Sequence, residues 1–333
     1  MIAPGSRRRW IWIAGWLLLF AFVVVAFLNV DWREAAALAQ GASWRWLIVA
    51  VLANASILLL VAWQWVILLP GAGWVRFPSM LWITAVTSTV SNGGPFMAGH
   101  AAGVHLLATR GEVGYATAVS VKALDQLTEG IAKLLLFAAT IAMSPLSSEL
   151  RWGVAGLLAG VSVLGVLLLG AAHRGHLLKD LAAHWPGWPG RVLEFLSRAA
   201  ADLEALRRPH VYLFAVALGG GKKLAEGLGI LAVLMALGVA VPAWGLLLVL
   251  SAVNFSTMAS VTPANVGIYE ASAVVAYGVV GLDTDLAVGI AVLQHIAYLV
   301  PMAGAGLLAL LGTHETLGAV TRVQSGQPSG PTD

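Results

Sequence analysis

The sequence predicts an all-α polytopic membrane protein with six full transmembrane helices and two re-entrant helical hairpins in an inverted repeat. Hydrophobic residues make up 59% of the 333 residues and charged residues only 11%. The mean hydropathy is +0.86. Several apolar runs approach the ~20 residues that a helix needs to cross the hydrocarbon core. An ordinary soluble domain is only about half apolar, so this composition excludes a soluble globular protein.

Two full spans are expected before the first interruption. The N-terminal segment RRRWIWIAGWLLLFAFVVVAFLNV begins like a signal peptide, but its apolar core exceeds the usual length of about 7 to 15 residues. We therefore expect it to remain as the first span. The second span is predicted over residues 44–69, with tryptophans placed as in an interfacial belt: Trp44, Trp46, Trp63 and Trp65.

The next apolar region is interrupted. Residues 79–90 and 101–108 are apolar but too short to cross the bilayer at about 1.5 Å per residue. The letters SNGGP stand between them, and Gly and Pro break helices. We therefore predict a re-entrant hairpin that enters and leaves on the same side.

The same order of elements returns in the second half of the chain. Full spans are predicted over 114–143, 151–172 and 211–238, then an interrupted pair over 244–260 and 268–280, and a last span over 286–312. The predicted organisation is one transmembrane domain over 1–312, with repeat one over 44–143, repeat two over 211–312, a cytoplasmic amphipathic loop over 173–210 and a disordered cytoplasmic tail over 313–333.

The two interruptions share a motif. Pro-x-x-x-Gly occurs at Pro95 and Gly99 and again at Pro263 and Gly267, each time after a full span and before a short arm, a Gly turn and a long span. Inverted repeats with broken helices are typical of transporters, whose substrate site lies near the midplane of the bilayer.

Basic residues predict the orientation. With the N-terminus inside, most of the 19 Lys and Arg residues lie in cytoplasmic loops or inside spans, and only Arg33, Arg45 and Arg151 fall outside. This bias predicts an inner-membrane protein with both termini in the cytoplasm. Because the basic residues form no continuous patch, we expect no nucleic-acid partner.

A stripe of charge runs along the predicted helix 114–143. Lys122, Asp125, Glu129 and Lys133 fall within an arc of about 80° at helical periodicity. Because charge facing lipid is costly, the stripe should face protein or water. Two interpretations stay open: ion pairs at i,i+3 and i,i+4 that neutralise each other, or part of a binding site.

A second charged cluster lies inside the span 211–238. The letters GGGKKLAEG place Lys222, Lys223 and Glu226 at interior depth. Two adjacent lysines cannot share one helix face, so at least one should point to a cavity or a partner, while the other snorkels or pairs with Glu226. An excess of cations beside helix N-termini suits a phosphate group, although Glu270 would restore neutrality.

Isolated polar residues have simpler interpretations. His100 follows the first break and either contacts a head group or lies at the interface. For His295, a hydrogen bond between helices is favoured over proton relay. Asn54 and Gln64 are expected to hydrogen-bond between helices. We expect no cofactor and no metal, since there is no cysteine and the loop histidines lack acidic neighbours: His173, His176 and His184.

Two stretches resemble a known family. GGPFMAGHAAGVHLLATRG with the following KALD, and more clearly TPANVGIYEASAVVAYGVVG, are similar to the lysylphosphatidylglycerol synthase transmembrane region, or flippase-like membrane protein family. The resemblance covers about residues 10 to 312, and its Pro-Gly-x-x-Gly-x-x-Glu motif falls on Pro263, Gly267 and Glu270. It implies movement of a lipid across the bilayer. Since the sequence carries no soluble aminoacyl-transferase domain, we expect no enzymatic activity.

The predicted function is transport or flipping of an anionic phospholipid or lipid-linked intermediate. Alternatives are a non-transporting lipid-binding subunit of an envelope or lipid-biosynthetic complex, and a small-solute or ion carrier. A homo-oligomer or a lipid-enzyme partner is compatible with either. The candidate substrate-binding residues are Lys122, Asp125, Glu129, Lys222, Lys223, Glu226, Pro95, Gly99, His100, Pro263, Asn265, Gly267 and Glu270.

Overall fold

The computed structural model describes residues 40–69, 75–93, 98–145, 156, 159, 209–259 and 262–313. Within these residues all regular structure is helical, with eight α-helices and two 3₁₀ turns, which confirms the all-α prediction for this part of the chain. Several predicted features lie outside the described residues: the N-terminal span, Pro95, the span over 151–172 apart from residues 156 and 159, the loop up to residue 208 with its three histidines, and the tail after residue 313.

Four of the described helices are long. They are α3 (Trp44–Leu68), α6 (Tyr115–Met143), α10 (Pro209–Ala236) and α13 (Thr284–Thr313), and each matches a predicted span to within a few residues. Three of them, α3, α6 and α13, are long and apolar enough to cross a membrane. α10 has 28 residues but carries Lys222, Lys223 and Glu226 in its interior, so its charges need partners within the protein.

The interrupted regions form pairs of short helices. α4 (Phe77–Gly93) is followed by α5 (Ala98–Arg110), and α11 (Ala243–Ser256) is followed by α12 (Ile268–Val280). Between α11 and α12 lie two 3₁₀ turns, η2 (Thr257–Ala259) and η3 (Pro263–Asn265). All four short helices have fewer than the ~20 residues of a full span.

Backbone conformation explains the second interruption. Ala264 and Asn265 adopt φ of 54° and 58°, and Gly267 adopts 85°. Such left-handed residues cannot continue a right-handed helix. At the start of α12, the Gly267 N–H donates to Glu270 Oε2 at 2.7 Å, so the side chain at the third helical position caps the backbone of the N-cap residue.

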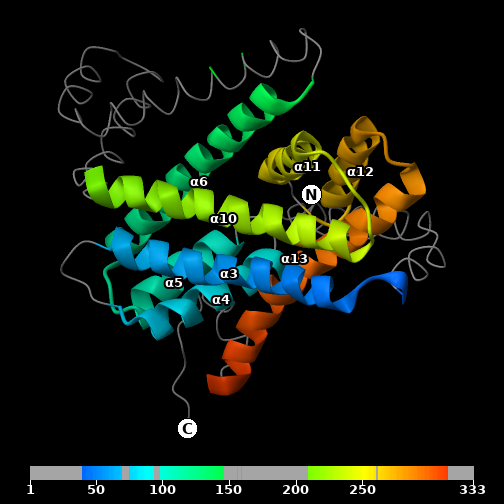
Figure 1. Ribbon diagram of the computed structural model, residues 1–333. Helices are drawn as coiled ribbons and strands as arrows, with labels where there is room; N and C mark the ends of the chain where they lie inside the picture. The colour runs from blue at the N-terminus through cyan, green and yellow to red at the C-terminus, as the bar shows by residue number, and fades with distance from the viewer. Residues whose placement is uncertain are drawn as a thin grey trace, which may run out of the picture.

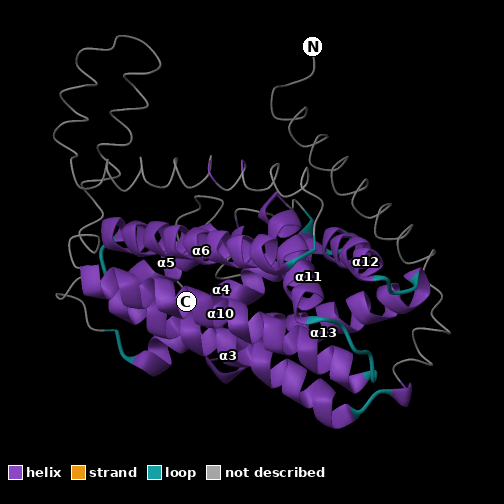
Figure 2. Ribbon diagram, turned by 45° about the horizontal axis from the view of Figure 1, so that its top comes forward, coloured by secondary structure: helices purple, strands orange, loops and turns teal. Residues whose placement is uncertain are grey.

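The long helices form the centre of the described structure. α3 and α10 pack side by side (Figure 1), with α4 and α5 towards one end of this pair and α11 and α12 towards the other (Figure 2). α13 packs against α3 and α4, while α6 packs against α10 and α11. The second break also reaches the first hairpin, because η3 contacts α4.

Two large apolar cores flank a polar middle. The first core includes Val121 and Leu124 of α6 and Ala215 of α10. The second includes Phe137 of α6 and Ile230 of α10. The charged residues of both helices fall between these cores along the chain. At about 1.5 Å per residue, α6 is roughly 44 Å long with Glu129 at its middle, so these charges lie far from both ends of the helix.

Candidate functional site

The charged residues of α6 and α10 form one continuous array. Lys122 Nζ lies 2.9 Å from Asp125 Oδ2. Lys222 Nζ lies 3.6 Å from Asp125 Oδ1 and 2.9 Å from Glu129 Oε2. Lys223 Nζ lies 2.6 Å from Glu129 Oε1. Positive and negative groups therefore alternate: Asp125 is shared between two lysines, and Glu129 contacts three, since Lys133 Nζ also lies 3.8 Å from its Oε1.

α11 completes the array. Lys223 Nζ lies 2.7 Å from Glu226 Oε1 and donates to Asn254 Oδ1 at 2.8 Å. The Asn254 amide donates to Glu226 Oε2 at 2.9 Å. We call this array the charge ladder, and its members are Lys122, Asp125, Glu129, Lys133, Lys222, Lys223, Glu226 and Asn254. With four lysines and three carboxylates, its ionised form carries an excess of positive charge.

The ladder resolves the question of the adjacent lysines. Lys222 contacts carboxylates of α6, while Lys223 contacts Glu129 of α6, Glu226 of its own helix and Asn254 of α11. Both are buried, with 4% and 6% of their surface exposed, so neither snorkels to the interface. The predicted pairing of Lys122 with Asp125 is confirmed, and so is that of Lys223 with Glu226.

At one end, the ladder reaches the first interrupted helix pair. The ammonium of Lys122 lies 4.7 Å from the centroid of the Trp65 ring. A Cβ at Gly103 of α5 would lie 3.5 Å from Lys122 Cδ, an ordinary contact, but only 3.1 Å from the Trp65 ring and from Thr87 Cγ2. Glycine at this position therefore lets α5 pack closely on α3 and α4, beside Lys122. Gln64 of α3 donates to Thr128 Oγ1 of α6 at 2.6 Å and to the Ala215 carbonyl of α10 at 3.2 Å, as expected of an interhelical partner.

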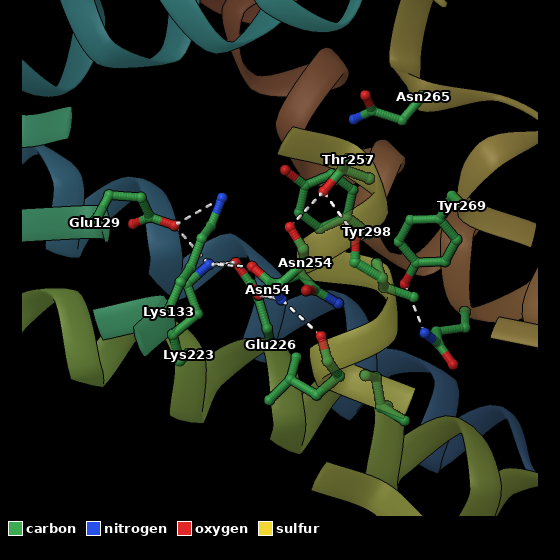
Figure 3. A pocket seen from close by; sticks show the side chains of 14 residues that line it. Asn54, Glu129, Lys133, Lys223, Glu226, Asn254, Thr257, Asn265, Tyr269 and Tyr298 are labelled. Atoms are coloured by element: carbon green, nitrogen blue, oxygen red, sulfur yellow. Dashed lines mark hydrogen bonds and ion pairs between the residues drawn. The ribbon is translucent and has the colours of Figure 1, made fainter. Parts of the chain in front are cut away.

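At the other end, the ladder opens into a cavity of about 240 Å³ (Figure 3). Charged residues of the ladder line one side, and residues from the second broken helix and from α13 line the other. The polar and aromatic lining residues are Asn54, Glu129, Lys133, Lys223, Glu226, Asn254, Thr257, Asn265, Tyr269, Gln294 and Tyr298. The cavity is therefore a polar chamber between the middle of α6 and α10 and the second break.

Lys133 is the least engaged cation of the ladder. Its Nζ lies 3.8 Å from Glu129 Oε1, longer than the ~2.7 to 2.9 Å of a charge-assisted hydrogen bond. Glu129 already forms ion pairs with Lys222 and Lys223 at shorter distances. Since Lys133 lines the cavity, its ammonium is the group best placed to bind an added anion.

Glu270 does not join the ladder. Its Oε1 lies 2.6 Å from His295 Nδ1 of α13, and its other oxygen caps Gly267. Among the described residues, Glu270 therefore contacts His295 and Gly267 and none of the lysines that it was expected to neutralise. The hydrogen bond expected for His295 is found, and its Nε2 contacts the Ala264 carbonyl oxygen at 2.9 Å.

Other candidates fall at different places. Asn265 lines the cavity, whereas Pro263, Gly267 and His100 do not. Gly99 packs so closely on α4 that an added Cβ would overlap Ser91. Lys122, Asp125 and Lys222 lie in the ladder but behind the cavity wall.

Sequence reasoning missed several cavity residues. Asn254 is a single amide within an apolar helix, and Tyr269, Gln294 and Tyr298 belong to apolar segments whose polar atoms converge only in three dimensions. Gln294 joins the hydroxyls of Tyr269 and Tyr277. The expectation for Asn54 was wrong: its amide donates to the Ala50 carbonyl of its own helix at 2.9 Å, and the residue faces the cavity.

Comparison with known proteins agrees with these features. No curated protein matches the chain. A family model does match, over residues 12–306, which includes every helix of the ladder, both interrupted helix pairs and the cavity. The protein thus belongs to the family described as the lysylphosphatidylglycerol synthase TM region.

Proposed function

We propose that this protein is a membrane transporter or flippase that moves an anionic phospholipid or lipid-linked intermediate across the inner membrane. The observation that carries the proposal is the polar cavity that Lys133 lines at one end of the charge ladder, beside the second broken helix. Family membership supports a membrane function. We further propose that the protein is not an enzyme and that both termini are cytoplasmic.

An anionic head group fits the cavity electrostatically. Lys133 provides an ammonium with only a long contact to Glu129. Figure 3 shows the side chains of Asn265 and Tyr298 on the side facing the ladder. The Asn265 amide and the Tyr298 hydroxyl can each donate a hydrogen bond to phosphate oxygens. Since Glu129 and Glu226 are held by lysines, their charges are screened from the anion.

A lipid is favoured over a small solute by a second hollow. An apolar groove of about 390 Å³ lies between α3 and α10, lined by Leu52, Ala53, Leu228 and Leu231 among others. Ala53 adjoins Asn54 of the polar cavity, so the groove and the cavity share the α3 and α10 pair as a wall. The head group of a lipid suits the polar cavity and its acyl chains suit the apolar groove, whereas a small polar solute has no apolar part for the groove.

In the proposed mechanism, the ladder keeps its own charges paired while the phosphate enters. Lys133 exchanges its long contact with Glu129 for the lipid phosphate, and the acyl chains stay in hydrocarbon. The hairpins from the two repeats are proposed to insert from opposite faces, so that each exposes the site to one leaflet in turn. The contacts of α13 with α3 and α4, and of α6 with α10 and α11, support this symmetry.

The direct test is transport in proteoliposomes. Fluorescent phosphatidylglycerol and phosphatidylcholine would be incorporated with the purified protein, and the accessible fraction followed with a membrane-impermeant quencher under imposed ion gradients. We expect faster exchange of the anionic lipid than in empty liposomes, and loss of that exchange in Lys122→Met with Asp125→Asn. Rates equal to those of empty liposomes under every gradient would contradict the proposal.

The same variant separates the alternatives. A non-transporting lipid-binding subunit would bind lipid and its partner without transport, and neutralising Lys122 and Asp125 would leave partner binding intact. A small-solute carrier would accumulate a labelled anion in the proteoliposome lumen without changing the distribution of lipid between the leaflets.

A further inference from the structure

We propose that the Glu270–His295 pair is a proton-binding site whose occupancy holds the second break in its observed conformation. The proton site itself does not depend on transport; only its coupling to lipid movement rests on the proposed function. The argument begins with the two ring nitrogens of His295. Nδ1 faces a carboxylate oxygen at 2.6 Å, and Nε2 faces the Ala264 carbonyl oxygen at 2.9 Å.

These contacts fix the number of protons. A carbonyl oxygen only accepts, so Nε2 must carry a hydrogen. The short contact between Nδ1 and Glu270 Oε1 then needs a second hydrogen, on either the imidazole or the carboxyl group. Without it, a nitrogen lone pair would face a carboxylate oxygen, and the contact would be repulsive. The pair is therefore bound only while it holds one exchangeable proton between the two side chains.

The pair is placed to exchange that proton. His295 is nearly enclosed, with 2% of its side chain exposed, whereas 25% of the Glu270 side chain is exposed. When the pair releases its proton, the imidazolium or the carboxylic acid gives one proton to water at Glu270. The products are neutral imidazole and a carboxylate. The net charge of the pair changes from zero to minus one, which a low-dielectric surrounding disfavours.

No neighbouring charge substitutes for the proton. α4 and α11 contain no ionisable side chain, and that of α3 is Arg45 in its first turn. The ionisable groups that face the pair or the adjoining cavity come from α6, α10, α12 and α13: Glu129, Lys133, Lys223, Glu226, Tyr269 and Tyr298. The lysines among them already contact ladder carboxylates.

The pair controls the conformation of the break. Glu270 holds the Gly267 N–H, and His295 holds the Ala264 carbonyl, so the two side chains restrain both ends of the same turn. Ala264 and Asn265 lie there in left-handed conformations, which are sterically unfavourable for residues with a Cβ, more for alanine than for asparagine. Loss of the proton removes a restraint on a strained segment, and that segment carries Asn265 into the cavity.

The test measures mobility of the break directly. The chain has no cysteine, so Val266→Cys provides a single site for a nitroxide label in the full-length protein. We expect an immobile electron paramagnetic resonance spectrum at low pH and a mobile one at high pH across about pH 5 to 10, in one transition. Transport is not needed for this signal, so its failure and that of the proposed function are distinguishable.

Two variants give opposite predictions. In Glu270→Gln, the amide donates to His295 Nδ1 and its oxygen accepts from Gly267, which mimics the protonated pair and should keep the label immobile at every pH. In His295→Phe, the ring can stack on Tyr269, as the imidazole does at 4.1 Å, but makes no hydrogen bond, and the label should be mobile at every pH. His105→Phe is the matched control, because His105 contacts Tyr115 at an exposed position, and it should preserve the transition.

A second measurement needs no variant, so it tests the proposal even if a substituted protein fails to fold. With ¹⁵N-labelled histidine in the otherwise unchanged protein, we expect two protonated ring nitrogens for His295, or one beside a neutral Glu270, while the break is immobile. A pH-independent label spectrum in the wild type, a mobile break in folded Glu270→Gln, or an unprotonated Nδ1 beside ionised Glu270 with the break still immobile would each overturn the proposal.

Discussion

Lys223 Nζ lies 2.6 Å from Glu129 Oε1, and this contact joins the middle of α10 to the middle of α6. Glu129 also contacts Lys222 and Lys133. Three lysines are therefore partly neutralised by one carboxylate. The contact between Lys223 and Glu129 holds α6 and α10 together, and both residues line the cavity of the proposed site.

Glu129→Gln should destabilise the protein strongly. Glutamine keeps the size of the side chain but removes the charge shared by the lysines. Breaking a buried ion pair from one side costs about 3 to 5 kcal/mol, and we expect a clear fall in the thermal midpoint measured in detergent. Glu112→Gln, at an exposed position between α5 and α6, should leave the midpoint unchanged. Adding Lys222→Met should recover part of the loss, and no recovery would contradict the electrostatic explanation.

Lys133→Met should weaken lipid binding more than folding. Because Lys133 has only the 3.8 Å contact to Glu129, its removal costs the ladder little. A lost charge-assisted contact to phosphate is worth about 1.5 to 3 kcal/mol, or roughly 10- to 150-fold in affinity. Binding of fluorescent phosphatidylglycerol to purified protein measures this loss. Arg45→Met, which removes an exposed cation, should leave affinity unaltered; an equal decrease in both variants would point to non-specific surface charge.

Asn265 allows backbone and side-chain effects to be separated. Asn265→Gly adopts the left-handed conformation without steric cost, while Asn265→Ala adopts it only with strain. We expect both to slow transport, since both remove the amide from the cavity, but only alanine should also lower stability, by about 1 kcal/mol. Transport assays and thermal unfolding on the same preparations measure the two effects. Normal transport by the glycine variant would exclude a role for the amide.

The contact between α13 and α4 predicts different effects at two nearby glycines. A Cβ at Gly306 would overlap the Ala85 carbonyl and the Thr89 hydroxyl, whereas one at Gly304 meets nothing within 4 Å. Gly306→Ala should therefore cost about 1 to 3 kcal/mol through overpacking. Gly304→Ala should be neutral or stabilising, by up to about 1 kcal/mol. Thermal unfolding of the two variants decides; equal midpoints would show that the helices can separate without cost.

The sequence predicts what depends on local periodicity. The helical spacing of Lys122, Asp125, Glu129 and Lys133 requires a common face, and the structure joins all four in one array. The predicted helix 268–280 agrees with α12 (Ile268–Val280), because Pro263 and Gly267 mark the break and Gly281 the end. These signals lie within a few residues of the features they specify.

Contacts between distant helices could not be read in this way. His295 and Glu270 meet because α12 and α13 fold back on each other, and no spacing rule relates the two positions. Asn254 has an equally long-range role with Lys223. In both cases a single polar residue in an apolar helix was the available signal, but it could not name the partner.

The distribution of charge also bears on how the protein is assembled. α6 carries two cations and two anions in its interior and is neutral by itself, whereas the interior of α10 has two lysines and one glutamate. At about 2.5 to 3.5 kcal/mol for each central charge, α10 on its own is a poor substrate for the insertion machinery. α6 is synthesised first, and its carboxylates are the groups that α10 meets. Retention of α10 in the bilayer should therefore require α6, whose carboxylates neutralise the lysines of α10 as it inserts.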